Sequence, residues 1–279
     1  MDIDWEPLPV SQKELFGSFI TDLKAAMNAQ MQGSILLVTT MIGDMDQVIP
    51  SMAAIDQYNI QTYIMSGPWD GWVTWHASPL YSGTYTFPSN GAPLPSIERS
   101  VNALVSKGVP KAKIGVGSKW SGAKWTGVNA PLQSWTTPPA WQDDIPFYSL
   151  MDANYPAANN KWDDVAKVPY ISIDGSGTTQ DQFISYENEQ SLTEKINYIK
   201  SSGIGGMIIW ELNSGYRANL PAGQRNPLLS AIKTAVGGGT VISPTGTNSC
   251  STKLGDANGD NEITLADYAV WRKAFIGKQ

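Results

Sequence analysis

Apolar runs and amphipathic stretches alternate along most of the chain. Residues 34–41 (SILLVTTM) are almost continuously apolar and rich in β-branched side chains, which is typical of a parallel strand buried on both faces. Residues 11–28 instead place apolar side chains on one helical face, and Ser11 and Glu14 have the spacing of a capping box. This alternation indicates a parallel α/β fold. The same patterns predict further strands at 1–6, 59–65, 113–117 and 206–212, and further helices at 46–57, 96–106, 191–201 (with a second capping box, Ser191 and Glu194) and 226–235.

Three other segments fall outside this alternation. Residues 118–190 are rich in Trp, Tyr, Pro and Asp, and we expect them to form an excursion of loops and small strands. Residues 237–253 (GGGTVISPTGTNSCSTK) have the composition of a flexible linker. Residues 254–279 then form a small module of their own. The expected division is a main domain at 1–236, the linker, and the C-terminal module.

The composition narrows the function classes. Charged residues make up 16% of the chain, against roughly 25% in an ordinary soluble domain, and the formal net charge is −6. No basic face of the kind that binds nucleic acid is expected, and no apolar run approaches the roughly 18 residues of a membrane span. One cysteine and one histidine argue against a disulfide, a zinc site and a Ser-His-Asp triad. The surplus is aromatic, with 11 Trp and 11 Tyr, and such side chains can stack on sugar rings.

Candidate chemistry lies on the first strand, where acidic and apolar residues alternate. Asp2, Asp4 and Glu6 are two residues apart, so a strand points all three carboxylates to one face. Carboxylates this close share protons, and at least one pKa should be raised. A carboxylic acid that is neutral at the working pH is what a general acid requires. The alternative is an acidic edge that is simply solvated, as we expect for the loop acids Asp143 and Asp144.

The segment Asp2–Glu6 (DIDWE) resembles the end of the signature D-G-x-D-x-D-W-E of the family 18 glycoside hydrolases, the chitinase family. Three further segments resemble, in order, the sixth strand of that family, its seventh strand with the following loop, and its eighth strand. They are 59–81, 113–127 and 205–216. The resemblance covers about residues 1–236, although the opening D-G of the signature is not present.

The resemblance implies a (β/α)8 TIM barrel, in which active residues lie at the C-terminal ends of the strands. It implies that the chain holds an incomplete barrel of about strands four to eight, with Glu6 at the end of strand four and an insertion after strand seven. Strands one to three would then precede Met1, and the strands at 1–6 and 206–212 would be open edges. A secreted protein is expected, with its signal peptide lost together with that N-terminal part.

The resemblance also implies an activity and a role for each site residue. Members of the family hydrolyse β-1,4 links between N-acetylglucosamine units of chitin and chitooligosaccharides, with retention and without a cofactor, and the substrate's own acetamide oxygen is the nucleophile. Glu6 corresponds to the acid and base, Asp4 to the residue that orients the acetamide and stabilises the oxazolinium ion, and Asp2 to its proton-sharing partner. Tyr63 corresponds to the tyrosine that binds the acetamide carbonyl, and Trp210 to the aromatic floor of the subsite for the distorted sugar.

Two positions depart from the family pattern. Ile64 stands where the family has an Asp after the tyrosine. This difference puts the rate and the pH optimum of hydrolysis in question, and the reaction class less so. Gln61 replaces a Met, and it either supplies a polar contact to the substrate or is an ordinary satisfied polar residue. Trp69 and Trp72 lie in the loop that follows, at the barrel end that carries function, and are candidate sugar-stacking residues.

Three other functions are open at this stage. The first is an endo-β-N-acetylglucosaminidase acting on glycoprotein glycans, but Trp5 argues against it because such relatives usually carry a different residue before the Glu. The second is a non-catalytic chitin-binding protein, but such relatives typically lose the Glu, and Glu6 is present. The third is an inactive fragment.

The C-terminal module carries the spacing of an EF-hand calcium loop. Ligand residue types stand at loop positions 1, 3, 5, 9 and 12, and position 7 can offer its backbone carbonyl. The module resembles a single type I dockerin repeat, half of a complete dockerin, so Ca2+ and a cohesin-like domain are its candidate partners. The alternative is a solvated acidic turn. The candidate ligands are Asp256, Asn258, Asp260, Glu262, Thr264 and Asp267.

Overall fold

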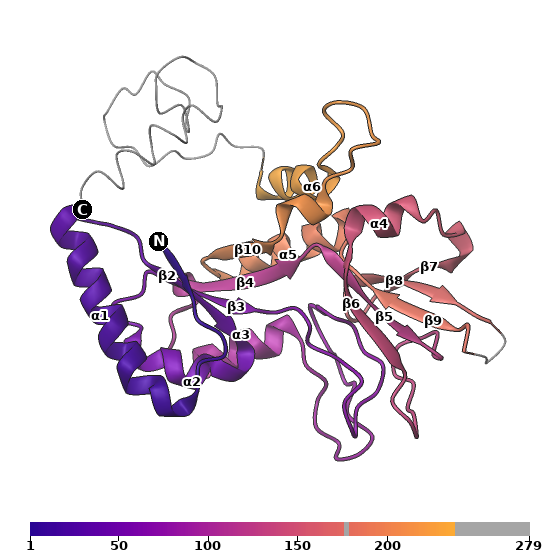
Figure 1. Cartoon of the computed structure of the whole chain (residues 1–279), viewed down its shortest axis with the longest axis horizontal. Coiled ribbons are helices and arrows are strands. Elements are labelled where there is room, and N and C mark those ends of the chain that lie inside the picture. The colour runs from indigo at the N-terminus through magenta and orange to yellow at the C-terminus, as the bar shows by residue number, and fades with distance from the viewer. Residues whose placement is uncertain (176–178, 238–279) are drawn as a thin grey trace. The chain divides into compact units, whose positions relative to one another are not determined.

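Five parallel strands form the main sheet, and their order in space follows their order in the chain (Figure 1). The computed structural model describes residues 1–175 and 179–237. Within these residues the sheet curls like half of a barrel, as a parallel sheet of sequential strands does when it begins to close. The strands are β1 (Asp2–Asp4), β2 (Leu37–Met41), β3 (Gln57–Gln61), β4 (Ile114–Lys119) and β10 (Gly206–Trp210).

Helices lie in the connections between these strands, because parallel pairing requires the chain to cross back before each new strand. The predicted alternation of strands and helices is thereby confirmed. α1 (Lys13–Gln30) connects β1 to β2, α2 (Met45–Val48) with its flanking 3-10 turns connects β2 to β3, α3 (Ile97–Ser106) precedes β4, α5 (Glu189–Ser202) precedes β10, and α6 (Pro227–Val236) follows it.

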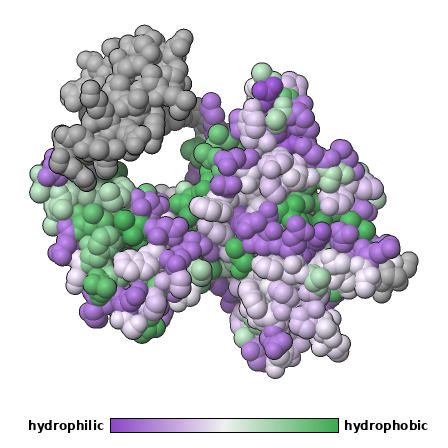
Figure 2. Space-filling view, in the orientation of Figure 1, coloured by the Kyte–Doolittle hydropathy of each residue, from purple (hydrophilic) through white to green (hydrophobic). Residues whose placement is uncertain are grey.

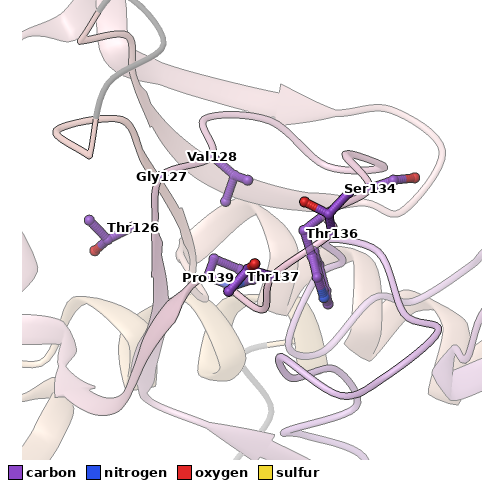
Figure 3. A pocket seen from close by; sticks show the side chains of 8 residues that line it. Thr126, Gly127, Val128, Ser134, Thr136, Thr137 and Pro139 are labelled. Atoms are coloured by element: carbon purple, nitrogen blue, oxygen red, sulfur yellow. The ribbon is translucent and has the colours of Figure 1, made fainter.

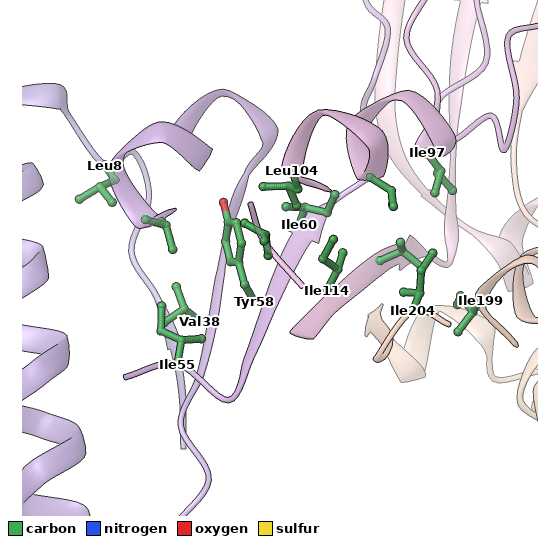
Figure 4. Packing of buried hydrophobic residues seen from close by; sticks show 14 of the residues in the cluster. Leu8, Val38, Ile55, Tyr58, Ile60, Ile97, Leu104, Ile114, Ile199 and Ile204 are labelled. Carbon is green, nitrogen blue, oxygen red and sulfur yellow. The ribbon is translucent and has the colours of Figure 1, made fainter. Parts of the chain in front are cut away.

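The main apolar core lies between the sheet and these helices. Val38 on β2, Tyr58 and Ile60 on β3, and Ile114 on β4 are fully buried, and Leu104 of α3 packs in the same cluster (Figure 4). The three central strands, β2, β3 and β4, are buried along most of their length, as a parallel sheet covered on both faces requires.

A row of polar side chains crosses three strands on the opposite face of the sheet. The Thr39 hydroxyl lies 3.0 Å from both carboxylate oxygens of Asp2, and the Asn59 amide donates to Thr39 Oγ1 at 3.2 Å. Gln57 in turn donates to Asn59 Oδ1 at 2.7 Å. A Cβ at Gly115 on β4 would lie 2.0 Å from Asn59 Oδ1, so only a glycine there leaves room for the row.

The excursion between β4 and α5 builds a second sheet, which is antiparallel and has the strand order β6–β5–β9–β8–β7. Its aromatic residues form a core, in which the rings of Trp125 and Phe183 lie 5.3 Å apart and are fully buried. The expectation of loops and small strands for 118–190 is confirmed, but the sequence does not show how these strands pair, because the pairing partners are far apart in it. The elements are β5 (Ser121–Thr126), β6 (Ala140–Pro146), α4 (Phe147–Asp152), β7 (Asn160–Asp163), β8 (Val168–Ile173) and β9 (Gln182–Ser185).

Helix starts differ from the predicted capping boxes. α1 begins at Lys13, directly after a 3-10 turn, and no side chain caps it, so the box of Ser11 and Glu14 is wrong. The 3-10 turn already supplies backbone hydrogen bonds at this end, which leaves fewer free N–H groups for a side chain to cap.

The start of α5 is capped three positions earlier than predicted. The Asn188 side chain accepts the Ser191 N–H at 2.9 Å, and the Ser191 hydroxyl accepts the Asn188 N–H at 2.9 Å. The expected box of Ser191 with Glu194 is therefore wrong. Asn is a preferred N-cap residue, because its short side-chain oxygen reaches the free N–H groups of the first turn.

Four strands are shorter than predicted, among them β1, which covers only Asp2–Asp4 of 1–6, and β10, which covers Gly206–Trp210 of 206–212. The strand expected at 34–41 begins only at Leu37, because the Ser34 hydroxyl closes a turn at the end of α1. The strand expected at 59–65 ends at Gln61, so the residues after it lie in a loop.

β1 and β10 are the edges of the parallel sheet in the described part of the chain, as the sequence predicts. Apolar side chains stay exposed near the β1 edge, and Figure 2 shows them gathered over α1. Leu15 and Ile35 are each 62% exposed, and Phe19 is 39% exposed. Some apolar exposure is ordinary for a folded protein, but here it is concentrated beside one sheet edge.

A buried ion pair joins α5 to the segment that follows β9. Lys195 Nζ contacts Glu187 Oε1 and donates to Ser78 Oγ at 2.9 Å, while the Ser191 hydroxyl donates to Glu187 Oε2 at 2.6 Å. The side chains of Lys195 and Glu187 are 0% and 2% exposed. Burial lowers the pKa of Lys195, and the Glu187 carboxylate offsets the cost of burying its charge. Removing one partner would leave the other charge buried without a counter-ion.

We therefore expect Lys195→Met to lower the free energy of unfolding by about 3–5 kcal/mol, measured by urea denaturation. The matched control is Lys167→Met, since Lys167 lies 3.8 Å from an Asp164 that is 88% exposed. That pair should contribute no more than about 1 kcal/mol. Similar losses in the two variants would show that the buried pair has no special role in stability.

Candidate active site

The C-terminal ends of the parallel strands lie along one side of the sheet, and the candidate residues stand at these ends or just beyond them. Asp4 ends β1, and Glu6 follows two residues later. Gln61 ends β3, with Tyr63 just beyond it, and Trp210 ends β10. Asp4, Glu6, Gln61 and Tyr63 are neighbours there, whereas Trp210 stands on β10, the strand at the opposite side of the sheet from β1.

Asp4 and Glu6 form a hydrogen-bonded pair of carboxyl groups. Burial raises the pKa of both groups; the Asp2 carboxylate raises that of Asp4 further, and Asp4 does the same for Glu6. Their mutual hydrogen bond lowers the pKa of Asp4 and raises that of Glu6. The Gln61 amide donates to Glu6 Oε1. The site thus contains two carboxyl groups with raised pKa values, in keeping with the raised pKa that the sequence predicts.

Tyr63 lies beside this pair and is 8% exposed. Burial raises its pKa, and the nearby Glu6 and Asp4 carboxyl groups raise it further, so the phenol stays protonated and able to donate. A Cβ at Gly117 would lie 2.7 Å from the Tyr63 ring, so this glycine makes room for it. The next residue, Ile64, has φ 55°, a left-handed conformation that β-branched residues rarely adopt, and its side chain is 37% exposed.

Trp210 borders an open cavity of about 270 Å3 at the same edge. Its backbone carbonyl accepts the Trp120 N–H at 2.7 Å, and its indole is 52% exposed. An indole fixed at the end of a strand and open to solvent on one side can serve as a stacking surface for a sugar ring. The cavity is lined by Ser121, Asp144, Pro146, Trp210, Glu211 and Ser214.

Trp69 and Trp72 form an aromatic pair in the loop after β3. Their ring centroids lie 4.5 Å apart in an edge-to-face arrangement, and Trp72 also meets Phe87 edge-to-face at 4.8 Å. Trp69 is 44% exposed, and its ring lies over Gly67, where a Cβ would approach it to 2.8 Å. Trp72 is therefore held by aromatic packing, whereas Trp69 keeps an accessible surface.

A larger cavity, of about 500 Å3, lies on the inserted antiparallel sheet at the end of β5 (Figure 3). No sequence motif marks this cavity, because most of its residues come from an irregular loop. Its lining combines one indole with hydroxyl side chains and contains no charged group. The lining residues are Thr126, Gly127, Val128, Ser134, Trp135, Thr136, Thr137 and Pro139.

No group of three or more metal-binding side chains occurs among residues 1–175 and 179–237. The same residues include no helix long and apolar enough to cross a bilayer. The C-terminal module lies outside the described residues, so its calcium loop and the cohesin-like partner stay predictions. These predicted ligands are Asp256, Asn258, Asp260, Glu262, Thr264 and Asp267.

The single histidine, His76, is not part of an open catalytic triad. Its Nε2 lies 3.0 Å from Asp163 Oδ2, and its Nδ1 lies 3.4 Å from Ser185 Oγ, which accepts the Ala77 N–H at 3.0 Å. His76 is fully buried and Ser185 is 1% exposed, so no substrate can reach the hydroxyl. Burial also lowers the pKa of His76, and the arrangement ties the loop after β3 to the inserted sheet.

Residues 1–215 match the sequence profile of Glycosyl hydrolases family 18. The chain belongs to this family. The match spans β1 to β10 and therefore includes the acidic strand, the inserted sheet and Trp210.

Curated relatives of this family 18 chain include Chitinase A1 from Niallia circulans, 29% identical over 248 residues, which are 80% of this chain and 34% of that protein. A probable endochitinase from Caenorhabditis elegans is 31% identical over 266 residues, 85% of this chain and 41% of that protein. The chain thus spans about a third to two fifths of the length of these relatives.

Solved structures show the same fold. The Group IV chitinase of Ostrinia furnacalis in complex with allosamidin superposes with a TM-score of 0.69 at 22% identity, covering 86% of this chain and 68% of that one. Family 18 domains have the TIM-barrel fold, and the curled parallel sheet of this chain corresponds to part of such a barrel.

The pKa values of the family 18 chain predict how its stability depends on pH. A carboxyl group whose pKa is raised on folding stabilises the folded state fully below its ordinary pKa, and this contribution is lost as the pH rises through the raised value. Asp4→Asn should therefore raise the melting temperature at neutral pH, and the gain should vanish below about pH 4. The gain should stay below about 1 kcal/mol, because the carboxyl group retains much solvent contact.

Thermal unfolding followed at both pH values tests this expectation. Asp22→Asn, on the exposed surface of α1, is the control and should show no such difference. A lower melting temperature of Asp4→Asn at neutral pH would mean that the carboxylate is stabilising as it stands.

Proposed function

We propose that the chain hydrolyses β-1,4 links between N-acetylglucosamine units of chitin or chitooligosaccharides, with retention and with the substrate's acetamide oxygen as nucleophile. The observation that carries the proposal is the Asp4–Glu6 pair at the C-terminal edge of the sheet. In this pair both carboxyl groups have raised pKa values, and the Tyr63 phenol beside them stays protonated. The names of the chitinase relatives support the same substrate class.

The arrangement suits each step of substrate-assisted cleavage. Glu6 donates its proton to the glycosidic oxygen while the acetamide oxygen attacks the anomeric carbon, and the leaving sugar departs as an alcohol. Asp4, which then carries the negative charge, accepts the acetamide N–H and stabilises the oxazolinium ion. Tyr63 donates to the acetamide oxygen and holds it near the anomeric carbon. Glu6 then takes a proton from the water that opens the oxazolinium ring.

The supporting residues follow from the same assignment. Asp2, held by Thr39, is the neighbour that can share a proton with Asp4. Trp210 stacks on the sugar that is distorted, and Gln61 orients the carboxyl group of Glu6. Trp69 offers a further stacking surface beyond this unit.

Finer parts of the assignment belong to the proposal as well. In the barrel of the family, β1, β2, β3, β4 and β10 are strands four to eight, and the antiparallel sheet is the insertion after strand seven. The protein is secreted, since its polymeric substrate is extracellular. Catalysis needs no cofactor, because the acid, the electrostatic stabiliser and the nucleophile come from Glu6, Asp4 and the substrate itself.

Glu6→Gln should lower the hydrolysis of chitooligosaccharides at least a hundredfold, because an amide has no proton to give, while binding of the oligosaccharide persists. Turnover is followed by product chromatography and binding by calorimetry. Glu14→Gln, an exposed residue of the first turn of α1, should keep full activity. Glu6→Gln turnover within about tenfold of wild type, or roughly 1.4 kcal/mol of barrier, would assign the acid to another residue.

The products should appear first as the β-anomer, and no covalent glycosyl-enzyme should accumulate. Retention follows from two displacements at the anomeric carbon, the first by the acetamide and the second by water. Proton NMR of fresh products reports the anomer, and mass spectrometry of the quenched protein reports any adduct. Initial release of the α-anomer, or a protein mass increased by a sugar unit, would contradict this mechanism.

A further inference from the structure

A lysine and two aspartates lie beside Trp210 at the catalytic edge of the sheet. Lys119 ends β4 and is the register partner of Trp210 on β10. Lys119 Nζ donates to Asp143 Oδ2 at 2.6 Å and lies 2.7 Å from Asp144 Oδ1. The expectation of a solvated loop acid is wrong for Asp143, whose side chain is 16% exposed, but it describes the exposure of Asp144, at 71%.

The two aspartates occupy a β-bulge. The pairing of β5 with β6 shifts between Gly122 and Lys124, so that Asp143 and Asp144 together stand opposite Ala123. A bulge turns a side chain in a direction that the regular ladder does not allow, and bulges are frequent beside active sites. Asp144 has φ 59°, a left-handed conformation that glycine adopts most readily.

Fold stability does not explain a carboxylate at Asp144. Asp143 already neutralises Lys119 at 2.6 Å in a more buried position. An ion pair as exposed as that of Asp144 contributes little, and its carboxylate stands next to a like charge. Glycine or asparagine would fit the left-handed backbone at least as well. The side chain at 144 therefore has a different role.

Asp144 lines the same cavity of about 270 Å3 that Trp210 borders, near the lower end of the volumes typical of ligand pockets, about 300 Å3. A smaller cavity is lined by Lys119 together with Tyr63 and Asp143, and Lys119 is also the register partner of Trp210. A carboxylate only accepts hydrogen bonds, and a sugar unit stacked on an indole presents hydroxyl and amide donors around its rim.

We propose that Asp144 is a substrate-binding residue that accepts hydrogen bonds from the N-acetylglucosamine unit held against Trp210. Lys119 is the positioning residue that keeps the Asp144 carboxylate at the cavity. The assignment rests on the proposed function, since it takes the ligand of the Trp210 cavity to be a chitooligosaccharide.

The test measures binding of chitotetraose by calorimetry in the full chain carrying Glu6→Gln, which prevents turnover. Asp144→Gly should raise the dissociation constant about tenfold, and Asp144→Asn about threefold, because a neutral acceptor makes a weaker hydrogen bond than a charged one. The melting temperature of Asp144→Gly should be equal to or above that of the parent chain, because glycine suits the backbone at this position. The matched control is Asp164→Asn, an 88% exposed acid of the same inserted unit, which should bind as the parent does.

The role of Lys119 is tested by a double-mutant cycle. Lys119→Met should weaken binding when Asp144 is present and should have no further effect in the Asp144→Gly chain, whereas Lys119→Arg should retain affinity. Weakening that simply adds to that of Asp144→Gly would overturn the positioning role.

The assignment of Asp144 and the proposed function would be overturned by different results. If Trp210→Ala weakens binding but both Asp144 variants bind as the parent does, the assignment of Asp144 is overturned and the proposed function stands. If Asp144→Gly lowers the melting temperature and leaves the dissociation constant unchanged, the residue is structural and the assignment is again overturned. If the parent chain does not bind chitotetraose at all, the proposed function itself fails.

Discussion

The polar row inside the curled sheet is the interaction on which the site depends. Asp2, Thr39 and Asn59 join β1, β2 and β3 through side-chain hydrogen bonds, and Gly115 leaves the space that the row needs. Side chains alternate between the two faces of a strand, so a shift of β1 by one residue would turn its carboxylates away from this row and toward the helices. The row therefore fixes which face of β1 carries the acidic side chains. As a consequence, Glu6 lies at the C-terminal end of the strands.

The close spacing of acidic side chains at the C-terminal ends of the strands raises the pKa values of their carboxyl groups. Asp4 and Glu6 lie close to each other and to Asp2, so burial and the neighbouring carboxylates raise the pKa of both groups. The same negative surroundings, added to burial, keep the Tyr63 phenol protonated. Two carboxyl groups with raised pKa values and a phenol that stays protonated thus stand within one small region. Pairs of titratable groups whose environments separate their pKa values are the usual basis for dividing acid and base roles.

Features that depend on residues close together in the sequence can be predicted from it, whereas features that depend on distant residues cannot. The two-residue period of Asp2, Asp4 and Glu6 is local, so their common face could be predicted, as could most strands and helices. The helix cap at Asn188 is also local, but Ser191 competes with it as a starting residue, and hydrogen-bond geometry decides between them. The antiparallel sheet of the insertion and the Lys119 contacts depend on partners distant in sequence. No periodicity encodes such pairings, so the structure was required to find them.

The bulge in β6 allows one side chain to change without disturbing the regular pairing of the strand. The regular part of the β5–β6 ladder continues on both sides of it, while the extra residue adds no pairing of its own. Asp144 can therefore be exchanged during evolution without moving the hydrogen-bonded frame, and Asp143 continues to neutralise Lys119 whatever stands next to it. A position of this kind lets related chains diversify the rim of the cavity beside Trp210 while the strand pairing around it stays unchanged.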